Sequence, residues 1–225
     1  MKVSAFSDVV CPWCYVGITR FERAAAAYTL ETGTPVDIAL RAYQFEPAAT
    51  SQHRPLLDAM DERLGGHASA MAVAVQVSQA GRADGLSFDF ESAVEANSFD
   101  AHRLLTWAES TDGLGAQRDL AHELWRAHFV EGADIADHVT LAARAAAVGL
   151  DADAADAWLA SDGGADEVRL QVETAASAGV RPQADGASAG GPTLVLEGKY
   201  AVSGAQPYDT YVQVLNEVAR NVGES

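Results

Sequence analysis

The sequence has few basic residues and only two cysteines, and it lacks any long apolar run. Lysine occurs only at Lys2 and Lys199, and 15 basic residues against 32 acidic ones give a formal net charge of −17. So negative a surface repels nucleic acid and anionic membranes, and we expect neither as a partner. The charge itself is typical of solubility or of adaptation to high salt.

No segment has 18 uninterrupted apolar residues, and the N-terminus lacks the basic and apolar regions of a signal peptide. We therefore expect a cytoplasmic protein. In that reducing compartment a disulfide is more often catalytic than structural. Because there is no third cysteine, any sulfur that exchanges with the pair must belong to another molecule.

Both cysteines lie in one short motif, Cys11-Pro12-Trp13-Cys14. An apolar segment over residues 3–6 predicts a strand before it, and apolar residues spaced by three and four predict a helix that continues to about residue 31. The pair therefore lies where a strand ends and a helix begins. Free N–H groups and the helix dipole at that point would stabilise a thiolate at Cys11 and can lower its pKa to roughly 3.5–7.5, whereas Asp8 acts in the opposite direction.

This position predicts different roles for the two sulfurs. Pro12 suits the first helical turn, and Cys14 falls on the buried face of the helix. We therefore predict Cys11 as the exposed attacking sulfur and Cys14 as the shielded resolving one. Three other interpretations are a zinc site, a structural disulfide and a chance pair. Zinc normally needs four ligands, and a disulfide across so short a loop would stabilise little. A C-x-x-C motif beside a βαβ pattern favours redox chemistry, so we expect no metal.

The rest of the chain predicts an α/β layer interrupted by helices. Residues 36–42 alternate apolar and polar, which indicates a second strand parallel to the first. From about residue 54 to residue 179 the spacing is helical; the expected helices are 68–80, one from 97 or 98, 116–129, 137–148, 154–160 and 166–178. A hairpin follows over 192–196 and 200–203, and then a last helix over 207–222.

These features resemble the DsbA family of thioredoxin-like proteins, and more narrowly its FrnE-like branch. The resemblance rests on the cysteine motif after Ser7-Asp8, a strand-opening proline far downstream, and the segments 97–104, 128–135 and 199–207. It implies an α/β thioredoxin fold interrupted by an inserted all-helical domain. Residues 1–53 and 180–225 would form the thioredoxin-like domain, and residues 54–179 the inserted helical domain.

The resemblance also implies thiol–disulfide oxidoreductase activity on protein or small-molecule disulfides and thiols. No bound cofactor is implied, and glutathione is a candidate co-substrate. Pro192 would be a cis-proline lying against the cysteine pair; the alternative is an ordinary trans proline at the start of an edge strand. Pro12, Trp13 and Gly191 would contact the substrate. Gly191 stands where relatives have a β-branched residue, and residues 181–190 look like an insertion in place of a compact Gly-Val-Pro.

Other expected site residues have two interpretations each. Asn97 is either a helix cap or a polar group of the substrate pocket, and His102 and Arg103 are expected more as contacts between domains than with substrate. The N–H groups at the start of the last helix could bind a carboxylate, such as the glutamyl end of glutathione, or form a simple turn; the residues concerned are Ser203, Gly204 and Gln206.

Two further functions compete with disulfide exchange. One is a glutathione-dependent isomerase or transferase related to the kappa-class transferases and hydroxychromene-carboxylate isomerases, which normally have serine at the position of Cys11 and no resolving cysteine. The other is a chaperone-like binding module with an apolar groove around Trp13, Tyr15 and Phe45. The sequence leaves the substrate, the direction of electron flow and the oligomeric state open, a homodimer included.

Overall fold

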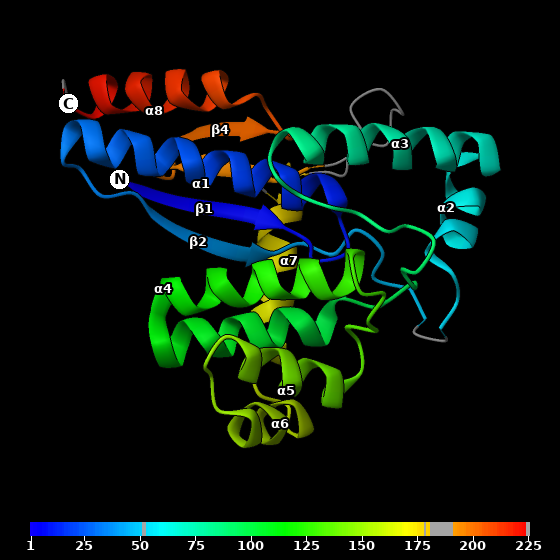
Figure 1. Ribbon diagram of the computed structural model, residues 1–225. Coiled ribbons are helices and arrows are strands. Elements are labelled where there is room, and N and C mark those ends of the chain that lie inside the picture. The colour runs from blue at the N-terminus through cyan, green and yellow to red at the C-terminus, as the bar shows by residue number, and fades with distance from the viewer. Residues whose placement is uncertain (51–52, 178, 181–190, 224–225) are drawn as a thin grey trace.

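The computed structural model describes residues 1–50, 53–177, 179–180 and 191–223, so the expected insertion over 181–190 lies outside the described residues. Within these residues a four-stranded sheet has the order β2-β1-β3-β4 (Figure 1). Its strands are β1 (Lys2–Ser7), β2 (Asp37–Ala42), β3 (Thr193–Leu196) and β4 (Tyr200–Ser203). β1 pairs in parallel with β2 and antiparallel with β3, which pairs antiparallel with β4. The predicted strands and the parallel pairing are confirmed.

The helices follow the predicted order, with one addition. The helices are α1 (Pro12–Thr32), α2 (Leu56–Leu64), α3 (His67–Ala83), α4 (Phe99–Phe129), α5 (His138–Ala147), α6 (Ala152–Ala160), α7 (Ala165–Ser177) and α8 (Tyr208–Gly223). The sequence analysis did not predict α2. It predicted two helices over the span of α4, and Gly113, with φ 82° and ψ −174°, does divide α4 into two helical segments across a kink. Glycine adopts this positive φ without a steric penalty, so the chain bends there and the helix resumes.

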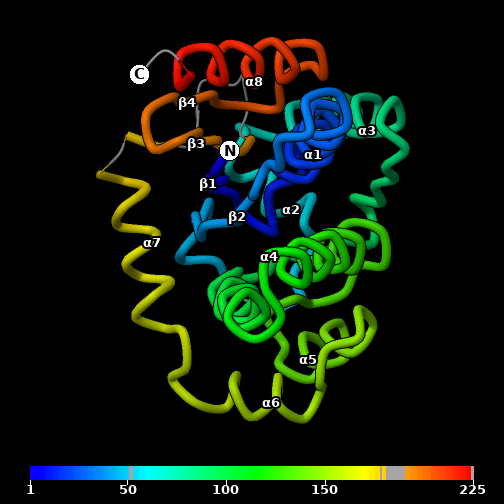
Figure 2. The backbone as a smooth tube through the Cα atoms, turned by 90° about the vertical axis from the view of Figure 1, so that its left-hand side faces the viewer, coloured from blue at the N-terminus to red at the C-terminus, as the bar shows by residue number. Residues whose placement is uncertain are grey.

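Helices cover both faces of the sheet. α1 and α8 lie together on one face and α7 lies on the other, as Figures 1 and 2 show. Successive side chains of a strand point to opposite faces, and β1 follows this rule. Val3 and Ala5 belong to the main core with α1 and α8, whereas Phe6 packs with Ala175 of α7.

Two buried glutamine side chains hydrogen-bond to backbone groups of β2, the edge strand of the sheet. Gln117 of α4 accepts a hydrogen bond from the Leu40 N–H at 2.9 Å and donates one to the Leu40 carbonyl at 3.1 Å. Gln171 of α7 accepts from the Ala42 N–H at 2.7 Å. These side chains satisfy backbone groups that an edge strand otherwise offers to another chain. They also fix α4 and α7 to the sheet, and α4 carries part of the site described below.

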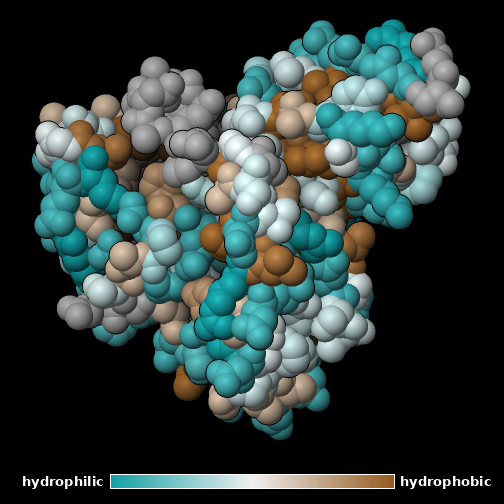
Figure 3. All heavy atoms as spheres, turned by 180° about the vertical axis from the view of Figure 1, so that it is seen from behind, coloured by the Kyte–Doolittle hydropathy of each residue, from teal (hydrophilic) through white to brown (hydrophobic). Residues whose placement is uncertain are grey.

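One cluster of buried side chains runs from the sheet into the helical segment. It includes Ile18 of α1, Leu124 of α4 and Tyr211 of α8. Seen from behind, hydrophilic residues cover much of the surface and apolar patches are scattered between them (Figure 3). Within the described residues, no helix has both the length and the hydropathy needed to cross a membrane. The division into domains 1–53 with 180–225 and 54–179 stays a prediction.

Candidate active site

The cysteine motif occupies the junction between β1 and α1. Cys11 is the N-cap residue of α1, with extended backbone angles of φ −100° and ψ 110°, and Pro12 follows in the first turn. The Cys11 Sγ accepts a hydrogen bond from the Cys14 N–H at 3.3 Å. A sulfur in this position receives a backbone N–H donor and lies at the positive end of the helix dipole. The predicted junction of strand and helix is confirmed.

Both cysteines are free thiols and both are buried. Cys11 is 6% exposed and Cys14 is 2% exposed. The expectation of an exposed Cys11 is therefore wrong, because Cys11 forms part of a pocket wall below the surface. Burial raises the pKa of the Cys14 thiol well above its ordinary value, and the neighbouring Cys11 raises it further. Cys14 is accordingly a protonated thiol at neutral pH.

A pocket of about 330 Å³ opens beside Cys11. Pro12 and Trp13 form one part of its wall, as their predicted contact with substrate requires. The loop after β2 contributes Phe45, and α4 contributes His128. Most of the remaining wall is apolar and comes from α2, α3 and the loop before α4: Leu56, Met60, Leu64, Val73, Phe90 and Ala96. A volume of this size suits a small ligand, since such pockets span about 300–1,000 Å³.

Asp8, which is 0% exposed, ties the cysteine turn to its surroundings. Its carboxylate accepts a hydrogen bond from the Phe45 N–H at 2.6 Å. The His102 Nε2 lies 3.2 Å from the same carboxylate and 3.1 Å from the Tyr43 carbonyl oxygen. Both of these oxygens are acceptors, so Nε2 carries the hydrogen. His102 is thus a contact between α4 and the sheet, which agrees with the packing role expected for it.

The main chain of Asp8 is fixed as well. Its carbonyl oxygen accepts hydrogen bonds from the Cys11 N–H and from the Trp125 Nε1, each at 3.2 Å. Tyr15 stacks on Trp125, with 5.3 Å between the ring centroids and an interplanar angle of 14°. The cysteine turn is therefore held from β1, α1 and α4 at once, and this restricts where the Cys11 sulfur can lie.

Pro192 lies close to the motif but with a trans peptide bond. No peptide bond within the described residues is cis, so the expected cis-proline is wrong. The alternative is only half right, because the trans Pro192 precedes β3, which lies between β1 and β4 and is not an edge strand. A Cβ placed on Gly17, one turn beyond Cys14, would lie 2.7 Å from the Pro192 Cδ. Gly191 has φ 128°, and a Cβ there would lie 2.8 Å from the Ala205 backbone nitrogen. A glycine precedes β3 because a side chain at this position would collide with the backbone of Gly204 and Ala205, which follow β4.

Comparisons with known proteins show the family to which the chain belongs. A family model described as the DSBA-like thioredoxin domain matches residues 2–216. The chain belongs to this family. The structure of a probable DsbA oxidoreductase from Streptomyces coelicolor is 32% identical and has a TM-score of 0.82, covering 96% of this chain and 89% of that one. The predicted fold class, a thioredoxin fold interrupted by helices, is confirmed.

Two more distant structures share the fold. The cytosolic disulfide reductase DsbM from Pseudomonas aeruginosa, solved with GSH, is 23% identical with a TM-score of 0.62, and the match covers 98% of this chain and 100% of that one. A 2-hydroxychromene-2-carboxylate isomerase is 15% identical with a TM-score of 0.66, covering 100% and 98%. No curated protein matches the sequence.

In this member of the DSBA-like family, the expected carboxylate-binding turn is engaged within the protein. The Gly204 N–H donates to the Pro192 carbonyl at 2.9 Å, and the Gln206 side chain donates to the Ser203 carbonyl at 2.8 Å. The Gln206 N–H donates to the Gly204 carbonyl at 2.9 Å. α8 begins two residues later, at Tyr208. These residues do not line the described part of the cysteine pocket.

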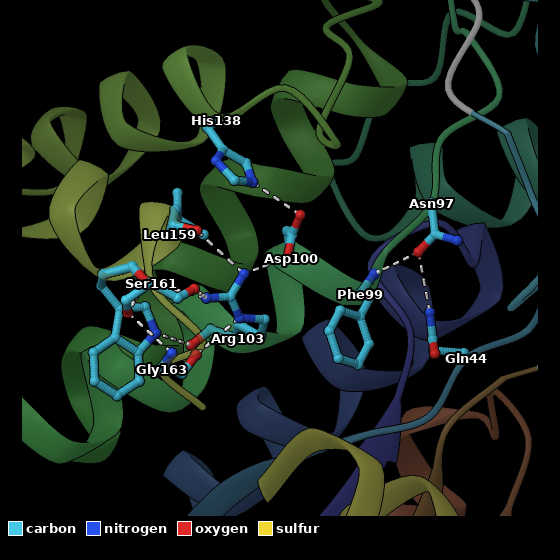
Figure 4. Close-up of polar contacts among 10 residues, drawn as sticks. Gln44, Asn97, Phe99, Asp100, Arg103, His138, Leu159, Ser161 and Gly163 are labelled. Atoms are coloured by element: carbon cyan, nitrogen blue, oxygen red, sulfur yellow. Dashed lines mark hydrogen bonds and ion pairs between the residues drawn. The ribbon is translucent and has the colours of Figure 1, made fainter. Parts of the chain in front are cut away.

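Asn97 contributes to a different hollow, beside α4 and α7. The Asn97 Oδ1 accepts from the Phe99 N–H at 2.9 Å and from the Gln44 side chain at 3.3 Å, as Figure 4 shows. Asn97 therefore accepts the first N–H of α4 from the residue before the N-cap position, which Ser98 occupies, so it helps to begin the helix without being its N-cap residue. In the same view Arg103 reaches carbonyl oxygens at the end of α6 and just after it, including those of Leu159 and Gly163, which makes it a packing residue.

Sequence reasoning missed two contributors to the pocket. Leu56, Met60 and Leu64 recur every four residues and form the inner face of α2, so apolar periodicity could have predicted that helix. His128 stands at the end of α4, more than 100 residues from the cysteines, and no spacing rule connects it to them. Among the described residues, no group of three or more histidine, cysteine, aspartate or glutamate side chains could hold a metal ion.

Proposed function

We propose that this member of the DSBA-like family is a thiol–disulfide oxidoreductase in which Cys11 is the nucleophile and Cys14 the resolving cysteine. The observation that carries the proposal is the position of the Cys11 sulfur. It accepts a backbone hydrogen bond at the start of α1 and lines the pocket, whereas the Cys14 thiol is buried one turn further on and keeps its proton. Because only the Cys11 sulfur lines the pocket, we assign the attack on the substrate to Cys11 and the later attack on the mixed disulfide to Cys14.

The proposed reaction has two exchange steps. The Cys11 thiolate attacks one sulfur of a substrate disulfide, a bond forms between Cys11 and that sulfur, and the other half leaves as a thiolate. Cys14 then loses its proton and attacks the Cys11 sulfur, which releases the second half as a thiolate. The released thiolates take up the two protons that the cysteines lose. The protein is oxidised by two electrons to the Cys11–Cys14 disulfide, and the substrate is reduced by two.

Neighbouring residues have proposed supporting roles. Pro12 and Trp13 line the pocket and would contact the substrate. Pro192 and Gly191 would set the position of β3 beside α1 through the close approach to Gly17. A cytoplasmic location, glutathione as a co-substrate and membership of the FrnE-like branch belong to this proposal as hypotheses. DsbM, which is described as cytosolic and was solved with GSH, motivates the first two.

The test compares two single variants. The reduced protein is mixed with hydroxyethyl disulfide or glutathione disulfide, and the thiol released is measured over time. Cys11→Ser should abolish exchange, and Cys14→Ser should form a persistent mixed disulfide that intact-mass measurement detects. Normal exchange by Cys11→Ser would overturn the proposal. Full glutathione-dependent turnover of a small substrate by Cys14→Ser would instead support the isomerase or transferase alternative. Aggregation suppression that survives mutation of both cysteines would support the chaperone alternative.

A further inference from the structure

Two carboxylates and one guanidinium line the pocket beside Cys11. Among the described residues of its wall, apart from Cys11 itself, these are the groups that carry a charge at neutral pH: Glu46, Glu95 and Arg63. The Arg63 guanidinium lies 3.5 Å from the Glu46 carboxylate, so these two charges offset each other. His128 is uncharged, because burial lowers its pKa to about 4. The pocket wall therefore has one net negative charge, and it belongs to Glu95.

The Glu95 carboxylate is poorly compensated within the protein. Only 13% of its side chain is exposed, and its ion-pair partner Arg54 lies 3.8 Å away, too far for a hydrogen bond. The same guanidinium lies 2.6 Å from the carboxylate of Glu62, so one cation serves two anions. Glu95 lines the described pocket, whereas Arg54 does not. A carboxylate removed from water normally has a close cation or several N–H donors, so Glu95 favours a cation that enters from the pocket.

The proposed reaction adds to this negative charge. Cys11 attacks as a thiolate, and the charge passes along the reacting sulfur atoms during exchange. A substrate with an ammonium group near its disulfide would be attracted by both anions, and a substrate carboxylate would be repelled by both. The formal charge of −17 on the whole chain acts in the same direction at low salt. The rest of the wall is mostly apolar and suits a short methylene chain.

We propose that the pocket beside Cys11 selects small disulfides of aminothiols, and that Glu95 is the residue that binds their ammonium group. This inference rests on the proposed exchange function and specifies its substrate class. The first exchange step would release one aminothiol, and the second step would release the other. A volume of about 330 Å³ encloses a molecule of that size. Glutathione disulfide has four carboxylates against two ammonium groups, so we expect it to react more slowly than an aminothiol disulfide.

Three disulfides of similar length test the substrate class. They are cystamine, which carries an ammonium group on each arm, hydroxyethyl disulfide, which is neutral, and dithiodipropionate, which carries a carboxylate on each arm. The rate constant for oxidation of the pre-reduced protein is measured with each probe by acid quenching and mass analysis. Each value is divided by the rate constant of the same disulfide with dithiothreitol, which corrects for the acidity of the leaving thiol.

We expect the corrected rate constant of cystamine to exceed that of hydroxyethyl disulfide at least about tenfold, the factor that one charged hydrogen bond supplies. Dithiodipropionate should be the slowest of the three. Salt separates the pocket from the charge of the whole chain, because the Debye length in about 1 M sodium chloride is about 3 Å. A direct contact with Glu95 is screened much less, so cystamine should keep at least about a threefold advantage there.

Glu95→Gln tests the assigned residue, because it removes the charge and keeps the shape of the side chain. The corrected ratio of cystamine to hydroxyethyl disulfide should fall at least about fivefold in this variant. Glu173→Gln is the matched control: it changes the net charge by the same amount, but Glu173 is exposed on α7 and does not line the described pocket. It should keep the wild-type ratio within about twofold. Each ratio compares two probes on one protein, so a general loss of activity in a variant cancels.

The outcomes separate this inference from the proposed function. Equal corrected rates for cystamine and hydroxyethyl disulfide at high salt, a ratio that Glu95→Gln leaves unchanged, or an equal fall in Glu173→Gln would overturn the inference and leave disulfide exchange intact. A faster corrected reaction with dithiodipropionate, with glutathione disulfide or with the disulfides of insulin would overturn the assigned substrate class. Exchange that persists in Cys11→Ser would overturn the proposed function itself, and the inference with it.

Discussion

Lowering the pH from 7 to 5 should destabilise this protein through His128. Burial lowers the pKa of this histidine to about 4, against an ordinary value of 6.5. Between these two values the unfolded chain binds a proton that the folded chain does not. The free energy of unfolding therefore rises with pH, and the part that depends on His128 is lost as the pH falls from 6.5 toward 4. The whole effect is worth about 3 kcal/mol, and about 2 kcal/mol of it is lost between pH 7 and pH 5.

Urea unfolding of the reduced protein at the two pH values, followed by circular dichroism, measures this loss. His128→Gln removes the titrating ring but keeps a polar side chain, so this variant should lose about 2 kcal/mol less than the wild type over the same range. Carboxylates and the other histidines titrate in both proteins, so their contributions cancel in the comparison. The same loss in both proteins, within about 0.5 kcal/mol, would refute the reasoning. It would mean that the ring is solvated or paired in the folded state.

Three other predictions concern packing and the cysteines. Gly17→Ala should lower the free energy of unfolding by about 1–3 kcal/mol in urea, because the new Cβ would lie 2.7 Å from the Pro192 Cδ; unchanged stability would contradict that contact. Arg103→Lys should lower it by about 3 kcal/mol, since lysine cannot reproduce the hydrogen bonds of this buried guanidinium to several carbonyl oxygens, and a variant that melts with the wild type would argue against them. In Cys11→Ser, iodoacetamide should modify Cys14 at least about tenfold more slowly than free cysteine at pH 8, because burial raises the Cys14 pKa; equal rates would show that this sulfur is accessible.

Local patterns predicted most of the secondary structure and the chemical centre. The strand before Cys11 and the helix after it follow from hydrophobic spacing and from a proline at the first helical position, both of which act within one or two turns. The parallel pairing of β1 and β2 follows from the helix that connects them. Such features depend on neighbours in the chain, so the sequence carries them directly.

The α2 helix marks an error of pattern reading. Its apolar face, Leu56, Met60 and Leu64, is short and lies between Pro55 and the Gly65-Gly66 pair. The proline and the glycines indicate a loop when they are considered alone. A helix of this length is stable only when tertiary contacts bury its apolar face. In α2 that face packs against α3 and forms part of the pocket wall.

The sequence by itself determined that two cysteines meet the start of a helix, and therefore which atoms can exchange electrons. Only the tertiary structure decided what surrounds them. Residues of α2 and α3 and His128 at the end of α4 line one pocket with Cys11, and Arg63 of α2 pairs with Glu46 from the loop after β2. Burial and charge pairing between distant segments depend on how the helices pack, and no local spacing in the chain records that packing.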